Sequence, residues 1–210
     1  MSLISGAERR AALRLPNELV GARVVLRPYT MADAPAQFEA VDQSRDRLRL
    51  WMGWVDDHRT VADAEDYCRR VSATWAERSD FSLGIWRRDD GRYLGGTGFH
   101  NTDWSVPSFE VGYWIREGEV GKGYVEEAVR LQVRFAFDVL GAARLMLTCD
   151  PLNERSRRIP EAIGFVLEGR LRNHMRIDTG ELRDTLVFSL IPSDMAADAG
   201  SESQPPGHRA

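Results

Sequence analysis

The sequence predicts a single domain of mixed α/β type, α+β in arrangement, on a mostly antiparallel sheet of about seven strands flanked by helices. Three consecutive runs rich in β-forming residues, separated by turn residues, indicate an antiparallel meander. They lead into a strand–loop–helix–strand unit, which is typical of a sheet covered by helices. With 210 residues, 43% hydrophobic and 29% charged, the chain is long enough to bury the core of one such domain.

The strands are expected where aliphatic, β-branched and aromatic residues cluster between turn residues. The first ends at Pro28, which cannot donate a ladder hydrogen bond. Apolar residues recur at helical spacing after residue 123, so a long helix with a broad buried stripe is expected there. The expected strands are residues 22–28, 81–88, 93–104, 108–115, 143–150, 165–173 and 183–191. The expected helices are residues 31–43, 61–78, 124–140 and 153–164.

The two ends of the chain are expected to lie outside this domain, which spans residues 21–192. Residues 1–20 form an N-terminal extension, irregular or helical, that carries no motif. Residues 193–210 are small, polar and proline-containing. Such a composition cannot bury a core, so it predicts a disordered tail.

Charge and cysteine content argue against several classes of function. The net charge of −4 is unusual for a nucleic-acid binder, which normally has a basic face. Cys68 and Cys149 form neither a metal-binding pattern nor a set of bridges, which favours a reducing, cytoplasmic location and no metal. The sequence shows no signal peptide and no run of about 18 apolar residues, so no membrane span is expected.

The stretch EVGKGYVEEAVR, residues 119–130, places Gly121 and Gly123 just ahead of the long predicted helix. Glycine is favoured where the backbone needs a positive φ or must approach another group closely. The first N–H groups of a helix have no internal partner and readily bind phosphate. The spacing matches neither G-x-G-x-x-G nor a P-loop. A tight turn before a helix explains one glycine better than two, so the pattern indicates a phosphate site.

The strand SFEVGYWI, residues 108–115, leads directly into this turn. Its alternation places Glu110, Gly112 and Trp114 on one face. A solvated glutamate beside a strand glycine is the plainer interpretation. A ligand held by the glycine turn would, however, lie along the same strand, and Gly112 would leave room for it.

The stretch DPLNERSRRIPEAIGF, residues 150–165, reads as a capped helix. Asp150 and Asn153 are both able to cap its start, and Gly164 is suited to end it. Nothing in this stretch alone requires more than a structural role.

Together these pieces resemble the GNAT superfamily of acyl-CoA-dependent N-acyltransferases, in its RimJ/RimL-type branch of ribosomal-protein N-terminal acetyltransferases. The resemblance covers about residues 22–192 and is carried by LRLWMGW, FEVGYWI, VGKGYVEEAV, NERSRRIPEAIGF and GELRDTLVFSL. It implies a GNAT-type domain in which the central strands 108–115 and 143–150 splay apart. It also implies acetyl-CoA as cosubstrate and an amine as acceptor.

The resemblance assigns the cofactor site as well. The backbone of the glycine turn would cradle the CoA pyrophosphate, because a helix start is positive. Pantetheine would pair with the strand edge, and a side chain of the NERS segment would contact the cofactor arm. The expected cofactor-binding residues are Tyr113, Trp114, Ile115, Gly121, Lys122, Gly123, Tyr124, Val125, Glu126 and Asn153.

The chemistry is direct attack of a neutral amine on the thioester in a ternary complex. An α-amine has a pKa of about 7.7–8, so it needs only modest help from a base. Glu110 is the first choice, directly or through a water, and a backbone N–H of Glu110–Gly112 would polarise the thioester carbonyl. By resemblance, Ser156 would supply a proton or hydrogen bond to the leaving thiolate. His100 and His174 are alternative bases, although ordinary surface histidines are the plainer interpretation.

Several other residues have both a functional and a structural interpretation. Trp51, Trp54 and His100 would border the acceptor pocket, with core packing equally suited to the two tryptophans. Cys149 ends a strand near the cofactor slot and is by default a small buried hydrophobe. The arginines of the helix at 153–164 would pair with the CoA 3′-phosphate or form a solvated face; they are Arg155, Arg157 and Arg158.

Three positions depart from the family pattern. Val120 stands where many members have Gln or Arg, and Val125 stands where they have Ala or Gly. Pro160 stands where an aliphatic residue is usual, and its missing N–H deprives the Ser156 carbonyl of its helical partner. We therefore expect a kinked or shortened helix at Ser156–Pro160, a displaced Ser156 hydroxyl, and another group that satisfies the Ser156 carbonyl. The alternative is a helix that ends early and a thiolate that departs into solvent.

The leading hypothesis is an acetyl-CoA-dependent N-acetyltransferase acting on a peptide α-amine. A small amine such as a polyamine or an aminoglycoside is the alternative acceptor. A non-catalytic acyl-CoA-binding module is a different class, but it would need neither Glu110 nor Ser156. A dinucleotide-binding domain lacks the required glycine spacing and acidic residue. A monomer or a homodimer would suit the family.

Overall fold

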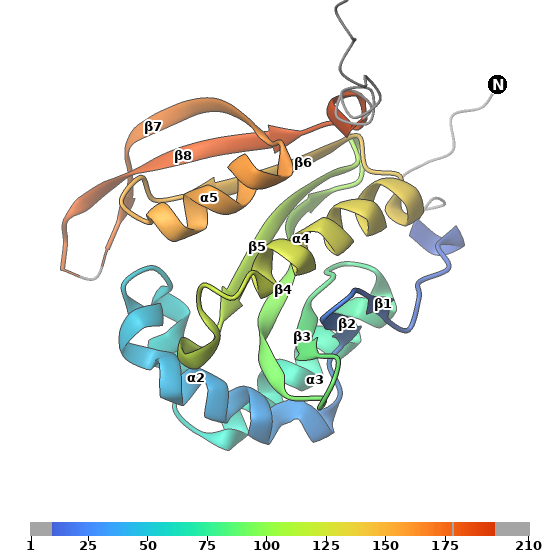
Figure 1. Cartoon of the computed structure of the whole chain (residues 1–210), viewed down its shortest axis with the longest axis vertical. Helices are drawn as coiled ribbons and strands as arrows, with labels where there is room; N and C mark the ends of the chain where they lie inside the picture. Colours follow the sequence, from blue (N-terminus) through green and yellow to red (C-terminus); the bar gives the residue numbers. More distant parts are fainter. Residues whose placement is uncertain (1–9, 178, 196–210) are drawn as a thin grey trace, which may run out of the picture.

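The computed structural model describes residues 10–177 and 179–195, which form one mixed sheet with helices packed on it (Figure 1). The sheet has eight strands in the order β1-β2-β3-β4-β5-β6-β8-β7. Its strands are β1 Leu19–Val20, β2 Val24–Pro28, β3 Leu83–Arg87, β4 Tyr93–Asp103, β5 Ser108–Ile115, β6 Arg144–Cys149, β7 Val166–Arg176 and β8 Leu182–Leu190. Its helices are α2 Ala34–Arg49, α3 Val61–Glu77, α4 Tyr124–Arg134 and α5 Glu154–Ile163, with short turns η1 Met31–Asp33, η2 Gly53–Asp57, η3 Glu117–Glu119 and η4 Phe135–Leu140.

The predicted α+β class and the antiparallel meander are confirmed. Strands β2 to β5 pair antiparallel in chain order, and β6, β8 and β7 continue the sheet. The strand that exceeds the expected seven is the two-residue β1, which pairs with β2 at the sheet edge. The long predicted helix divides into α4 and the π-helical turn η4, which ends at Gly141 with φ of 66°.

The central strands β5 and β6 form the parallel pair of the sheet and separate soon after they meet. Their pairing covers Ser108 with Arg144, Phe109 with Leu145 and Glu110 with Met146. Beyond Glu110, β5 continues beside β4 to Ile115, while β6 runs with β8 and β7 (Figure 1). The splay expected for residues 108–115 and 143–150 is therefore present.

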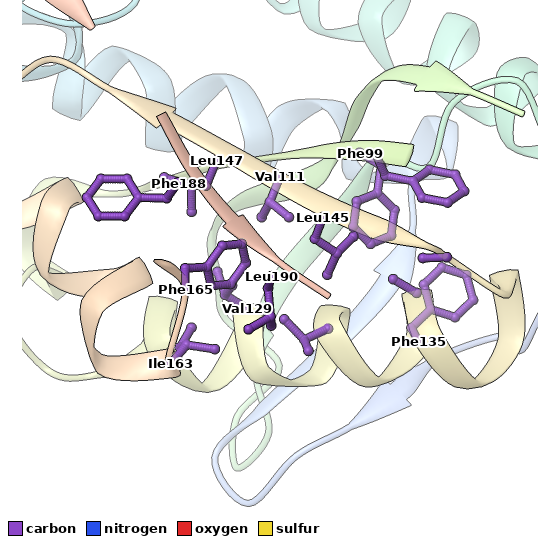
Figure 2. Packing of buried hydrophobic residues seen from close by; sticks show 14 of the residues in the cluster. Phe99, Val111, Val129, Phe135, Leu145, Leu147, Ile163, Phe165, Phe188 and Leu190 are labelled. Carbon is purple, nitrogen blue, oxygen red and sulfur yellow. The ribbon is translucent and has the colours of Figure 1, made fainter. Parts of the chain in front are cut away.

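The two faces of β5 are buried against different helices. Phe109 and Val111 belong to the large core cluster under α4 and α5, whereas Trp114 packs in a second cluster built from α2 and α3. Figure 2 shows the first cluster, where side chains of β4, β5, β6 and β8 meet those of α4 and α5. Because side chains alternate along a strand, one short strand supports both cores.

Aromatic rings fill the wide end of the first cluster. The Phe81 ring lies edge-on to those of Phe99, Phe109 and Phe135, with centroids 6.4, 6.3 and 6.0 Å apart. Trp75 of α3 stacks on Phe135 at 6.0 Å. These rings make up much of the core beneath β4 and β5.

Helix α5 does not end at Pro160, although a helix shortened there was one of the two expected forms. Helix α5 is continuous from Glu154 to Ile163, so the prediction of a shortened helix is wrong. The physical reason is that a tertiary donor replaces the missing amide: the Tyr113 hydroxyl donates to the Ser156 carbonyl at 2.9 Å. The expectation that another group satisfies this carbonyl is thereby confirmed.

Replacing Phe99 with alanine should lower the free energy of unfolding by about 3–5 kcal/mol, because a fully buried ring leaves a cavity among three neighbouring rings. Urea unfolding followed by fluorescence measures this change. The matched control is Val106→Ala in an exposed loop, expected within about 0.5 kcal/mol of the unsubstituted protein. Equal shifts in the two variants would contradict this assignment of the core.

Candidate active site

The glycine turn lies at the start of α4 and has the backbone that its sequence suggested. Gly121 and Gly123 both have φ of 79°, in the left-handed region that favours glycine. Gly123 is the cap residue and α4 begins at Tyr124. The first N–H groups of such a helix have no partner within it and carry the positive end of the helix dipole. The turn is therefore suited to an anion.

Arg23 of the β1–β2 connection holds this turn from behind. Its guanidinium donates to the carbonyl of Lys122 at 2.8 Å and to that of Gly123 at 3.3 Å. It also pairs with Glu127 of α4 at 2.9 Å, and Glu127 accepts from the backbone N–H of Arg23 and Val24. Burial disfavours the Glu127 carboxylate, but these donors outweigh it and lower its pKa. Sequence reasoning missed Arg23, because no local pattern connects it with a turn so distant in the chain.

The unpaired edge of β5 approaches the turn through η3. The carbonyl of Ile115, at its end, accepts a hydrogen bond from Arg47 of α2, which also pairs with Glu117. Lys122 donates to the buried Glu119 at 2.8 Å, which keeps the lysine amine on the η3 side of the turn. The strand edge and the turn are thus fixed relative to one another by side chains on both sides.

Tyr113 and Ser156 meet across the splay. The Tyr113 hydroxyl lies 2.9 Å from the Ser156 carbonyl oxygen and 3.1 Å from the Ser156 Oγ. Burial raises the pKa of Tyr113 well above its ordinary value, so the phenol is protonated at neutral pH. Asn153 caps α5 as expected, since its Oδ1 accepts from the Ser156 N–H at 3.2 Å.

Glu110 lies in the last residue pair between β5 and β6, at the point where the two strands separate. One carboxylate oxygen accepts from Asn101 of β4 at 2.6 Å, and the other accepts from Thr148 of β6 at 2.7 Å. The group is therefore held by the strands on both sides of β5.

A cavity of about 710 Å³ opens on the α2–α3 face of the splay. Trp54, His100, Gly112, Tyr113 and Trp114 line it together with polar residues of α2, η2 and α3. Trp54 is partly exposed and its ring packs against Trp114 with centroids 6.1 Å apart. The lining does not include Trp51 or Glu110. The remaining lining residues are Gln37, Met52, Asp57, His58, Asp63, Asp66, Tyr67, Arg70, Ser82, Gly96 and Thr97.

The space left by Gly112 is taken on one side by His100. A side chain at position 112 would begin 2.6 Å from the His100 Nε2, so the missing side chain allows the imidazole to lie across β5. The other ring nitrogen is 3.9 Å from Asp80. Burial disfavours the Asp80 carboxylate, but His100 and Ser82 outweigh it and lower its pKa. The ring therefore faces the cavity with a carboxylate behind it.

The other candidate residues lie apart from this arrangement. His174 contacts Thr185 at 3.0 Å within the β7–β8 hairpin and does not line the cavity. Burial raises the pKa of the Cys149 thiol to about 11, as expected for a buried hydrophobe.

Val120 and Val125 pack against the cluster under β2, β3 and β4. Of the three arginines of α5, Arg157 pairs with Glu161, while Arg155 and Arg158 are exposed.

Among residues 10–177 and 179–195, no group of three or more His, Cys, Asp or Glu side chains is arranged to hold a metal ion. Within the same ranges, none of the helices combines the length and the apolar character that crossing a bilayer requires.

A splayed strand pair, a glycine turn at a helix start and a cavity beneath the splay define an N-acetyltransferase of the GNAT type. The family profile described as acetyltransferase (GNAT) domain matches residues 23–166, and the chain belongs to this family. The [ribosomal protein uS5]-alanine N-acetyltransferase of Escherichia coli is 29% identical over 174 residues, covering 82% of this chain and 89% of that protein. The predicted family and its RimJ/RimL-like character are confirmed.

Two solved structures share the fold. The microcin C7 self-immunity acetyltransferase MccE, in complex with acetyl-CoA and AMP, superposes with a TM-score of 0.77 at 19% identity, covering 81% of this chain and 93% of that one. RimL, the ribosomal L7/L12 α-N-protein acetyltransferase, in complex with coenzyme A, gives a TM-score of 0.75 at 16% identity, covering 83% and 97%.

Proposed function

We propose that this protein transfers the acetyl group of acetyl-CoA to a primary amine, with the α-amine of a protein N-terminus as the acceptor. The observation that carries the proposal is the position of Gly112, Tyr113 and Trp114. They lie beyond the last pair of β5 with β6, and the same three residues line the 710 Å³ cavity. A donor lying along the strand and an acceptor in the cavity would meet at this point.

The donor site follows from the glycine turn. The CoA diphosphate would accept hydrogen bonds from the backbone N–H groups of Gly121–Glu126. The helix dipole is positive there, and two of these residues lack side chains. Pantetheine would then pair with the free edge of β5 near Tyr113, like an added strand. Asn153 and Ser156 at the start of α5 would face the arm from the other side of the splay.

Transfer would take place in one ternary complex. The amine nitrogen forms a bond to the thioester carbon, the C–S bond breaks, and CoA leaves as a thiolate that accepts a hydrogen bond from Ser156. The amine proton passes to a base. We assign this role to Glu110. Its carboxylate lies where β5 and β6 separate but does not line the cavity, so it would act through a water. His100 is the second candidate base, since it does line the cavity.

The cavity lining has more acidic than basic side chains. It contains the carboxylates of Asp57, Asp63 and Asp66 and the guanidinium of Arg70, but Asp63 caps α3 and Asp66 pairs with Arg69, so Asp57 is the carboxylate we assign to an amine acceptor. Trp54 and Trp114 supply apolar walls for the first side chain of a peptide. The names of the relatives, a uS5-alanine and an L7/L12 N-terminal acetyltransferase, favour a protein α-amine over a small molecule.

Replacing Gly123 with valine should weaken acetyl-CoA binding at least about tenfold in calorimetry, because valine is strained at a φ of 79° and its Cβ would lie 3.1 Å from the Arg23 guanidinium that holds the turn. Gly91→Val is a close control: Gly91 has φ of 69°, near the 79° of Gly123, and lies in the exposed β3–β4 turn. Its effect on the Kd should stay within about twofold. Similar losses of affinity in both variants would contradict the assignment of this turn as the diphosphate site.

Glu110→Gln should lower kcat/KM about 10- to 100-fold at pH 6.5 and only a few-fold at pH 9. An α-amine with a pKa of about 7.7–8 is mostly protonated at the lower pH and mostly neutral at the higher one, so the need for a base falls as pH rises. The pH–rate profile of His100→Gln serves as the comparison. If Glu110→Gln has the pH–rate profile of the unsubstituted enzyme and His100→Gln loses kcat/KM at pH 6.5, then His100 is the base.

The acceptor is tested by thiol release from acetyl-CoA with a panel of amines, with mass spectrometry of each product. Peptides with a free N-terminus should react faster than the same peptides with a blocked α-amine and an intact lysine. Faster acetylation of spermidine or an aminoglycoside than of any peptide would show that the acceptor is a small amine. Acetyl-CoA binding without turnover on the panel would support the acyl-CoA-binding module instead.

A further inference from the structure

The carbonyl of Ser156 lacks its usual helical donor. In an α-helix each carbonyl accepts from the N–H four residues later, and here that residue is Pro160, which has no N–H. A carbonyl left without a partner in a partly buried position costs free energy. The Tyr113 hydroxyl provides the partner at 2.9 Å, from a strand on the other side of the splay.

Counting protons gives the direction of the second contact. A phenol has one proton, and Tyr113 gives it to the Ser156 carbonyl. The 3.1 Å contact between the two hydroxyl oxygens must then run from the Ser156 hydroxyl to the Tyr113 oxygen. The raised pKa of Tyr113 keeps that proton in place at neutral pH. The Ser156 Oγ is thereby held beside Tyr113 of β5, and its proton turns from the Tyr113 oxygen to the sulfur when a thiolate forms there.

We propose that Tyr113 is a positioning residue for Ser156: its hydroxyl replaces the amide that Pro160 lacks, ties the first turn of α5 to β5, and orients the Ser156 hydroxyl. The role of Ser156 towards the thiolate rests on the function proposed above. The tie itself depends only on the geometry of Tyr113, Ser156 and Pro160.

Pro160 makes the tyrosine the replacement for a helical donor. With an N–H at position 160, α5 would supply a partner to the Ser156 carbonyl by itself, so loss of the tyrosine hydroxyl would no longer leave that carbonyl unsatisfied. Pro160 is one of the two buried residues of α5. A local defect in α5 is thus the feature that joins α5 to β5.

A double-mutant cycle tests the tie without requiring catalysis. Tyr113→Phe should lower the folding equilibrium constant about tenfold in urea unfolding, because the Ser156 carbonyl loses its donor. In a Pro160→Ala background, which restores the N–H, the same change should lower it by about twofold or less. The matched control is Tyr93→Phe, which removes a buried hydroxyl bonded to Tyr29 at 2.8 Å, far from α5. Its effect should be the same in both backgrounds.

A second cycle tests the orientation of Ser156. Tyr113→Phe should lower kcat about tenfold at saturating acetyl-CoA while the KM for acetyl-CoA changes less than about threefold. In a Ser156→Ala background it should leave kcat unchanged, because the hydroxyl to be positioned is already gone. An equal loss of kcat in both backgrounds would show that Tyr113 acts independently of Ser156 and overturn the positioning role.

The two cycles separate this proposal from the proposed function. An effect of Tyr113→Phe on unfolding that is independent of residue 160 overturns the tie, even if the enzyme acetylates peptides. Coupling between positions 113 and 160 in a protein that shows no acetyl transfer supports the tie and rejects the proposed function.

Discussion

The short pairing of β5 with β6 is the constraint on which the rest of the structure depends. Three residue pairs hold these strands together, and past Glu110 the backbone of β5 has no strand on that side. Backbone groups left in this way need partners from elsewhere. Arg47 supplies one at Ile115, and Tyr113 sends its own side chain across the gap to α5.

The alternation of side chains along β5 then sorts the chemistry onto two faces. Gly112 and Trp114 lie on the cavity side of β5, with Trp114 in the cluster of α2 and α3, while the Tyr113 side chain reaches Ser156 of α5. In the proposed function, donor and acceptor would approach this strand from opposite sides. A shift of the register by one residue would exchange the two faces, so the buried Phe109 and Val111 matter for the proposed site as well as for the core.

Much of this arrangement could be predicted from local patterns. The strand runs, the positive φ of Gly121 and Gly123 and the cap at Asn153 each follow from a few neighbouring residues. Arg23 could not be assigned in the same way, because its partners lie in the glycine turn and in α4, distant in the chain. Pro160 shows the limit most clearly. Proline removes a helical hydrogen bond, as the rule says, but the helix does not end there. A tyrosine from another strand donates to the Ser156 carbonyl instead.

The pairing of Arg23 with Glu127 has a consequence for the order of folding. These residues are 104 positions apart, and they join the connection before β2 to the first turn of α4. The carbonyls of the glycine turn are held in place only when this early segment has docked against a helix made much later in the chain. A contact between such distant segments forms slowly, since a long loop must close first. We therefore expect the glycine turn at the start of α4 to reach its final geometry late in folding, although every residue of the turn is adjacent in sequence.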